Sequence, residues 1–339
     1  MVRTHATEEI SMKMSAKILG AAAVAAGFMV SGAFAQSKPT PPKPVMSASS
    51  QVGGSLYVTY VAAWIPIVQD AFDGLSISQE PGGSSQNIML VSGGQTDFGI
   101  TASSQAYIGY HGLGWANGTK YQDFVALHPS FPTYMTVVTL ADSGIENFSD
   151  LAGKELAVGV PGGGSDTIAR ELMGYLGVEP DRYVNASWED TGGLLRDGLA
   201  DAILYIAGHP AGFMQELEVN QQLKFLQLSN DQIDGFLEEY PYYAPVDLKA
   251  GTYKAMTEDL NTVGQMNFMM GSPDLPDDFV VTLLDAVYAN TDKLAQSHPN
   301  FSQTRLENVR GMPTPLHPAA KRYYEEKGVE MRQAASPKQ

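Results

Sequence analysis

Short apolar segments that end in glycine- or hydroxyl-rich turns recur along this sequence, and a segment with helical spacing follows each turn. The run 155–160 (ELAVGV), for example, leads into PGGGS, and apolar residues at helical spacing follow from 167 to 176. The run 97–101 (DFGIT) leads into ASSQ in the same way. Strand–helix–strand alternation of this kind predicts an α/β fold with mostly parallel sheets. A chain of 339 residues is long enough for two domains.

The same patterns place the individual elements. Strands are predicted at 75–79, 97–101, 124–127, 134–140, 155–160 and 201–206, and helices at 58–72, 85–92, 167–176, 282–297 and 318–327.

Five of the turns share a composition that suits ligand binding. They lie at 53–55 (GGS), 81–85 (PGGSS), 101–105 (TASSQ), 161–167 (PGGGSDT) and 207–212 (AGHPAG). In open α/β sheets, ligands bind outside the carboxyl ends of the strands, and helix N-termini there suit anions. Glycine and serine also serve for capping alone, which accounts for any single turn. Five such turns in one chain predict a shared cleft.

Composition excludes several classes of protein. The chain has 21 Lys and Arg against 37 Asp and Glu, a formal charge of −16, so a general nucleic-acid binder is not expected. It has no Cys, which excludes disulfides, zinc ribbons and thiol nucleophiles. No cofactor motif is found, because the PGGGSDT turn lacks the lysine of a phosphate-binding loop. No metal pair is expected either, since none of the six histidines forms an HExxH motif.

The N-terminal segment predicts export. Lys13 and Lys17 precede an apolar run at 18–30, and Ala33 and Ala35 form the pattern that signal peptidase prefers. We therefore expect a signal peptide over 1–35, cleaved after Ala35, and a periplasmic mature protein. The alternative is a single N-terminal anchor, although the run is short for a membrane span. The acidic residues upstream of Lys13 favour a true start at Met12 or Met14.

Most of the mature chain, from about 49 to 328, resembles one family. The matching stretches, in order, are GGSLY, GGSSQNIMLVSGGQTDFGIT, LHPSFPTYMTVVTLADSGIENFSDLAGKELAVGVPGGGSDTIARELM, DAILYIAGHPAGFM, YYAPVDLKAGTYKAM and LHPAAKRYYEEKG. Together they resemble the TAXI subfamily of extracytoplasmic solute-binding proteins of TRAP transporters.

The resemblance implies a periplasmic-binding-protein-like fold with two lobes, two mixed sheets flanked by helices, and a β-strand hinge. The implied division is a signal peptide (1–35), a Pro-rich lead (36–45), lobe I (46–134 and 247–330), lobe II (135–246) and a tail (331–339). It further implies a monomer that closes around a small organic acid or amino acid and delivers it to a membrane permease.

The resemblance also assigns ligand contacts to the five turns. From lobe I these are Ser55, Tyr57, Ser84, Ser85, Asn87, Ser103, Ser104 and Gln105, and from lobe II they are Gly163, Gly164, Ser165, Asp166, Thr167, Tyr205 and His209. The chain departs from the family where Gly163 stands in place of a common serine and Ser165 in place of a common threonine. The identity of the solute therefore does not carry over.

Two other interpretations stay open. A secreted hydrolase would use Ser165 with His209, which requires an orienting acid and an oxyanion site. A binding protein of an ABC importer, or a sensor subunit, would have the same lobes and another partner. The neighbouring genes would separate the two transporter classes, because a TRAP system encodes a large permease of many spans and an ABC importer encodes an ATPase.

Overall fold

The computed structural model describes residues 38–51 and 55–329. The predicted signal peptide, the start of the lead, the first two residues of the turn at 53–55 and the tail at 331–339 lie outside these residues. None of the helices in the described part combines the length and the apolar character needed to cross a bilayer.

Ten strands and ten α-helices make up the described part of the chain. The strands are β1 (Val45–Ser49), β2 (Ser76–Glu80), β3 (Phe98–Ala102), β4 (Val125–Leu140), β5 (Glu155–Gly159), β6 (Arg182–Asn185), β7 (Ala202–Ala207), β8 (Leu223–Leu226), β9 (Ala244–Leu248) and β10 (Leu260–Gly271). The helices are α1 (Leu56–Gln69), α2 (Ser84–Ser92), α3 (Ser103–His111), α4 (Gly164–Leu176), α5 (Trp188–Arg196), α6 (Gly212–Asn220), α7 (Asn230–Glu239), α8 (Asp277–Ala289), α9 (Thr291–Ser297) and α10 (Pro318–Glu326).

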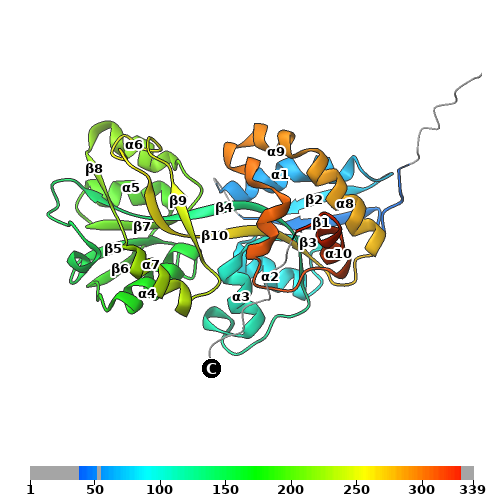
Figure 1. Cartoon of the computed structure of the whole chain (residues 1–339), viewed down its shortest axis with the longest axis horizontal. Coiled ribbons are helices and arrows are strands. Elements are labelled where there is room, and N and C mark those ends of the chain that lie inside the picture. The colour runs from blue at the N-terminus through cyan, green and yellow to red at the C-terminus, as the bar shows by residue number, and fades with distance from the viewer. Residues whose placement is uncertain (1–37, 52–54, 330–339) are drawn as a thin grey trace, which may run out of the picture. The chain divides into compact units, whose positions relative to one another are not determined.

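The strands form one hydrogen-bonded sheet in the order β2-β1-β3-β10-β4-β7-β5-β6, with β8 paired to β4 and β9 paired to β10. Pairs at the two ends, such as β1 with β2 and β5 with β6, are parallel, whereas β10 and β4 are antiparallel. The predicted α/β fold with mixed strands and flanking helices is confirmed. The family resemblance implies two separate sheets. The ladders are instead continuous, because β4 and β10 run from one group of helices to the other (Figure 1).

β4 differs from the sequence prediction, which split it into strands at 124–127 and 134–140. It is a single strand of 16 residues that contains Pro129 and Pro132. Proline cannot donate to a ladder, so inside a strand it accompanies irregular pairing. Accordingly, the register with β10 shifts between Met266 and Phe268, opposite these prolines. The prolines interrupt the pairing without ending the strand.

Another difference concerns the predicted helix at 282–297, which is two helices, α8 and α9. Asn290 separates them, with φ −124° and ψ 24°, and its side-chain amide donates to the carbonyl of Ala286. Asparagine favours such helix ends because its side chain competes for backbone groups.

The apolar side chains form separate clusters at the two ends of the β4–β10 strand pair. One cluster, which includes Trp64, Phe98 and Phe268, packs around α1, α8 and α10, within the residues predicted for lobe I. Two others lie mostly within the residues predicted for lobe II, on opposite faces of the sheet. The segment 248–260, predicted for lobe I, packs with the lobe II cluster through Tyr253 and Leu260. We therefore propose that lobe II extends to about residue 263.

Candidate functional site

The turn that leads into α1 is joined to the start of α2. Ser55 caps α1 by accepting from the amide of Tyr57 at 3.2 Å. The Tyr57 hydroxyl lies 3.0 Å from the Ser84 hydroxyl at the start of α2. Ser85 follows as a half-buried residue of the same first turn. We call the five predicted turns corners from here on. The first two of them, at 53–55 and 81–85, are thus in direct contact.

β10 supplies two polar side chains that the sequence analysis did not select. Asn267 accepts from the Tyr57 hydroxyl at 2.7 Å and donates to the carbonyl of Phe131 on β4 at 2.9 Å. Gln265 accepts, through Oε1, from the amide of Ser104 at the start of α3, at 3.1 Å. Both side chains are buried in a strand that is otherwise largely apolar. An amide side chain inside an apolar run was the available sequence signal.

The starts of α3 and α4 meet beside Gln265. Gln105 of α3 donates through Nε2 to the Thr167 hydroxyl of α4 at 3.3 Å. A Cβ placed on Gly164 would lie 3.6 Å from Nε2 of Gln265, an ordinary van der Waals distance, so the start of α4 lies against β10. Ser103 donates to the carbonyl of Tyr242 at 2.9 Å. The corners at 101–105 and 161–167, one from each lobe, therefore lie together.

Three of the helix starts suit an anion. The N-cap residues of α2, α3 and α4 are Gly83, Ala102 and Gly163, and none of them caps its helix with a side chain. The first backbone N–H groups of a helix carry partial positive charge and need acceptors. The five turns contain no Lys or Arg. An anion here would rest on backbone amides and side-chain hydroxyls or amides.

Three predicted contacts have structural bonds of their own. Asn87 donates to the carbonyls of Ser50 and Ile100, both at 2.7 Å. The Ser165 hydroxyl accepts from the amide of Ile206 at 2.9 Å, which ties α4 to β7. These bonds hold the corners in place, and direct contact of either residue with a ligand stays a prediction.

Asp166 is the third of these residues. Its carboxylate accepts from Arg170 at 2.8 Å and from the amide of Gly162 at 2.9 Å. Burial alone would raise the pKa of Asp166, but the bonds from Arg170 and Gly162 outweigh it and leave the pKa below its usual value. The charge of Asp166 is therefore engaged within its own helix turn, and its contact with a ligand also stays a prediction.

The fifth corner, after β7, brings aromatic rings to the site. Tyr205 packs edge-on against Trp188 at 4.4 Å and Phe213 at 5.2 Å between ring centres. Trp188 in turn fills the space over Gly159, where a Cβ would overlap its ring. A Cβ on Gly208 would overlap Leu56 of α1, so this corner touches lobe I.

His209 is buried in the same corner, and both of its ring nitrogens are engaged. Nδ1 lies 2.7 Å from the Tyr253 hydroxyl, and Nε2 lies 3.1 Å from the carbonyl of Tyr134. The carbonyl of Tyr134 can only accept, so Nε2 carries the proton of the neutral ring and Nδ1 accepts from the Tyr253 hydroxyl, which itself accepts from the amide of Ala211. Burial lowers the pKa of His209 to about 4, so the ring is neutral at pH 7.

These bonds do not supply the pair that a hydrolase would need. Ser165 is bonded to Ile206, and His209 to Tyr253 and Tyr134, so neither is positioned to activate the other. Within residues 38–51 and 55–329, no three metal-ligating side chains come together.

A carboxyl group next to the α3–α4 contact also escaped the sequence analysis. Glu171 of α4 accepts from the hydroxyls of Tyr242 at 2.6 Å and Tyr243 at 2.8 Å. Burial raises the pKa of Glu171 to about 7, although the two hydroxyls act in the opposite direction. The ring of Tyr242 also packs against Tyr107 of α3 at a tilt of 36°, so this network joins α4 to α3.

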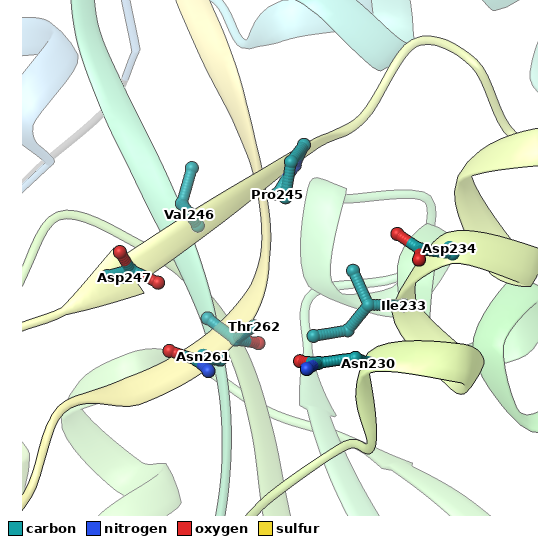
Figure 2. Close-up of a pocket in the computed structure, with 8 residues that line it drawn as sticks. All are labelled: Asn230, Ile233, Asp234, Pro245, Val246, Asp247, Asn261 and Thr262. Carbon is teal, nitrogen blue, oxygen red and sulfur yellow. The ribbon is translucent and has the colours of Figure 1, made fainter.

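A separate pocket of about 260 Å³ lies elsewhere on lobe II, between α7 and the β9–β10 pair (Figure 2). Its lining residues are Asn230, Ile233, Asp234, Pro245, Val246, Asp247, Asn261 and Thr262. None of the predicted contacts lines it, and none of the five turns contributes a residue to it. The hydrogen-bonded corners, and not this groove, are the candidate site.

Comparison with known proteins gives one family match and distant structural likenesses. A model of the NMT1-like family matches residues 48–328. One similar structure is a putative L-cystine ABC transporter protein from Listeria monocytogenes, with 11% identity, a TM-score of 0.45, and coverage of 76% of this chain and 95% of that one. Another is the periplasmic aliphatic sulphonate binding protein SsuA from Escherichia coli, with 12% identity, a TM-score of 0.47, and coverage of 83% and 82%. A third comes from work on glutathione import through GshT and the cystine ABC importer TcyBC of Streptococcus mutans, with 13% identity, a TM-score of 0.47, and coverage of 76% and 94%.

Proposed function

This chain belongs to the NMT1-like family, and we propose that it is an exported solute-binding protein. It captures a small organic acid or amino acid between its lobes and delivers it to a membrane importer. The observation that carries the proposal is the meeting of the α3 and α4 starts, one from each lobe, at Gln265 of β10. A solute bound there would hold the two lobes together.

The absence of Lys and Arg from the five turns is compatible with an anionic solute. Hydrogen bonds to charged groups contribute roughly 1.5–3 kcal/mol each. About four of them, less the cost of ordering, approach the ~8 kcal/mol of a micromolar complex. Backbone amides of α3 and α4 together with nearby side chains offer such a set. A solute with two or three carboxylates is less well served.

The membrane partner is proposed only as an importer. The sequence resemblance implies a TRAP permease, and no finding supports that class in particular. Of the structures above, one is a putative ABC transporter protein and another comes from work on an ABC importer. The ABC class is therefore to be tested first. Cross-linking of the mature protein to the permease encoded beside its gene, with and without solute, separates the two classes.

The binding proposal is tested by thermal shift and calorimetry over a panel of amino acids and small organic acids. We expect at least one monocarboxylate to raise the unfolding temperature and to release or absorb heat on binding. Native mass spectrometry of protein purified from the periplasm gives an independent view of a retained solute. If no compound of the panel binds and nothing co-purifies, the proposal is wrong.

A matched pair of variants separates site binding from general stabilisation. Gly164→Asp places a carboxylate at the start of α4, where a Cβ meets nothing closer than 3.6 Å, so the fold should be kept while an anion is repelled. Gly174→Asp makes the same change on the same helix, at a position with open space around it. We expect the first variant to lose anion binding and the second to keep it.

A further inference from the structure

Gln105 carries a buried oxygen that has no partner. Its side chain is 1% exposed and crosses from the start of α3 toward α4, where Nε2 donates to Thr167. Its Oε1 atom accepts no hydrogen bond from the part of the chain that the structure describes. A buried acceptor without a donor costs about 1–3 kcal/mol. A solute that brings an O–H or N–H group to this atom would remove that cost.

Gln265 lies beside the start of α3, and its side-chain oxygen, unlike that of Gln105, already accepts a hydrogen bond. The start of α3, a nine-residue helix without a side-chain cap, directs the amide of Ser104 at Oε1 of Gln265. That oxygen stands where a carboxylate oxygen would bind more strongly, because the helix start favours negative charge. A turn of the Gln265 amide would then present Nε2, a donor, to the same carboxylate.

The charges nearby decide between a hydroxyl and an ammonium group. The two acidic side chains in the first turns of α4 are engaged, Asp166 with Arg170 and Glu171 with Tyr242 and Tyr243. A buried ammonium group without an ionised partner is costly, because the charge loses its hydration. A neutral hydroxyl has no such requirement. An oxo group would face Oε1 of Gln105 with a second acceptor, and a turn of the Gln105 amide to present Nε2 would break its bond to Thr167.

We propose that the site selects a 2-hydroxy carboxylic acid. The carboxylate binds at the start of α3 in place of the Gln265 oxygen, and the hydroxyl on C2 donates to Oε1 of Gln105. Gln265 and Gln105 are therefore the residues that determine specificity. The inference rests on the proposed function and names the solute class for the same site.

The test compares acids that differ only at C2. Calorimetry of the mature protein with L-lactate, pyruvate and L-alanine, and with 2-hydroxyisocaproate, 2-oxoisocaproate and L-leucine, covers two sizes of side group. In at least one series, we expect the hydroxy acid to bind about tenfold or more tightly than its oxo and amino partners, the difference that one satisfied buried acceptor makes. Equal binding within both series, or a preference for the oxo or amino acid, overturns the inference.

Variants assign the preference to the two glutamines. Gln105→Met keeps the length of the side chain and removes the acceptor, so the hydroxy acid should lose its advantage over the oxo acid. Gln265→Glu places a permanent carboxylate at the start of α3, so all the acids should lose binding. The controls are Gln95→Met and Gln95→Glu, since Gln95 is exposed. A Gln105→Met protein that keeps the preference overturns the assignment, and circular dichroism of each variant verifies its folding.

The outcomes distinguish this inference from the proposed function. If an acid outside the two series binds and all six of these acids fail, the 2-hydroxy assignment is wrong and the binding function stands. If no compound binds at all, the proposed function is wrong and the 2-hydroxy assignment is wrong with it.

Discussion

The hydroxyl of Tyr57 donates a 2.7 Å hydrogen bond to Oδ1 of Asn267, a residue 210 positions later in the chain. The side-chain amide of Asn267 in turn donates to the carbonyl of Phe131 on β4. The start of α1 is thereby fixed to both of the strands that run between the lobes. Two hydrogen bonds in series therefore join this helix start to the β4–β10 pair.

Removing the Tyr57 hydroxyl should destabilise the protein. Tyr57→Phe leaves Oδ1 of Asn267 buried without its donor, which costs about 1–3 kcal/mol of the free energy of unfolding. Urea denaturation followed by circular dichroism measures the change. Tyr121→Phe, which removes a hydroxyl from a ring stacked on Trp115, is the control and should have a smaller effect. Equal losses in both variants would contradict the role given to the Tyr57–Asn267 bond.

The carboxyl of Glu171 should make stability fall as the pH rises. Burial raises its pKa from 4.5 to about 7, so the folded state holds the proton more tightly than the unfolded state. The resulting stabilisation is fully present below pH 4.5 and is lost between about pH 4.5 and 7, with an upper bound of about 3 kcal/mol. Glu171→Gln should remove this pH dependence. The free energy of unfolding of the variant should therefore rise relative to that of the natural protein between pH 4.5 and 7.

The measurement for Glu171 is urea denaturation at several pH values, read as the difference between variant and natural protein so that other titrating groups cancel. Glu326→Gln, at an exposed position of α10, supplies the baseline. A difference that stays constant from pH 4.5 to 7 would show that Glu171 does not titrate in this range.

His209 should act in the opposite direction. Burial lowers its pKa from 6.5 to about 4, so the folded state binds a proton less readily than the unfolded state. Its contribution is present above pH 6.5 and is lost as the pH falls through about 4, again by up to about 3 kcal/mol. His209→Gln should reduce the loss of stability on acidification, with His111→Gln, nearer the surface, as the comparison. Acid titrations that superimpose for His209→Gln and the natural protein would refute this assignment.

Gly159 should tolerate no side chain. Its φ is +75°, and a Cβ would overlap the ring of Trp188. Gly159→Ala should therefore lose about 1–3 kcal/mol from backbone strain and more from displacing the ring. Gly74→Ala is matched in backbone angle, with φ +69°, and has open space around it, so it reports the strain alone. Thermal unfolding of the two variants gives the comparison, and similar losses would mean that Trp188 is not held by this glycine.

Several features were readable from the residues alone. The run ELAVGV became β5, and the amphipathic segment after PGGGS became α4, because their periodicity is local. Four histidines precede prolines. Of these, His298 and His317 accept from the amides of Asn300 and Ala319. His128, in contrast, lies in β4 and accepts from the indole of Trp64.

The sequence by itself determined which turns would carry glycines and hydroxyls at strand ends, since this depends on neighbouring residues. Only the tertiary structure decided that Gln265 and Asn267 lie among these turns, because their partners Ser104 and Tyr57 are 161 and 210 residues away. It also decided that β4 continues through its prolines. A hydrogen bond between distant segments leaves no periodic pattern, so it becomes visible only once the chain is folded.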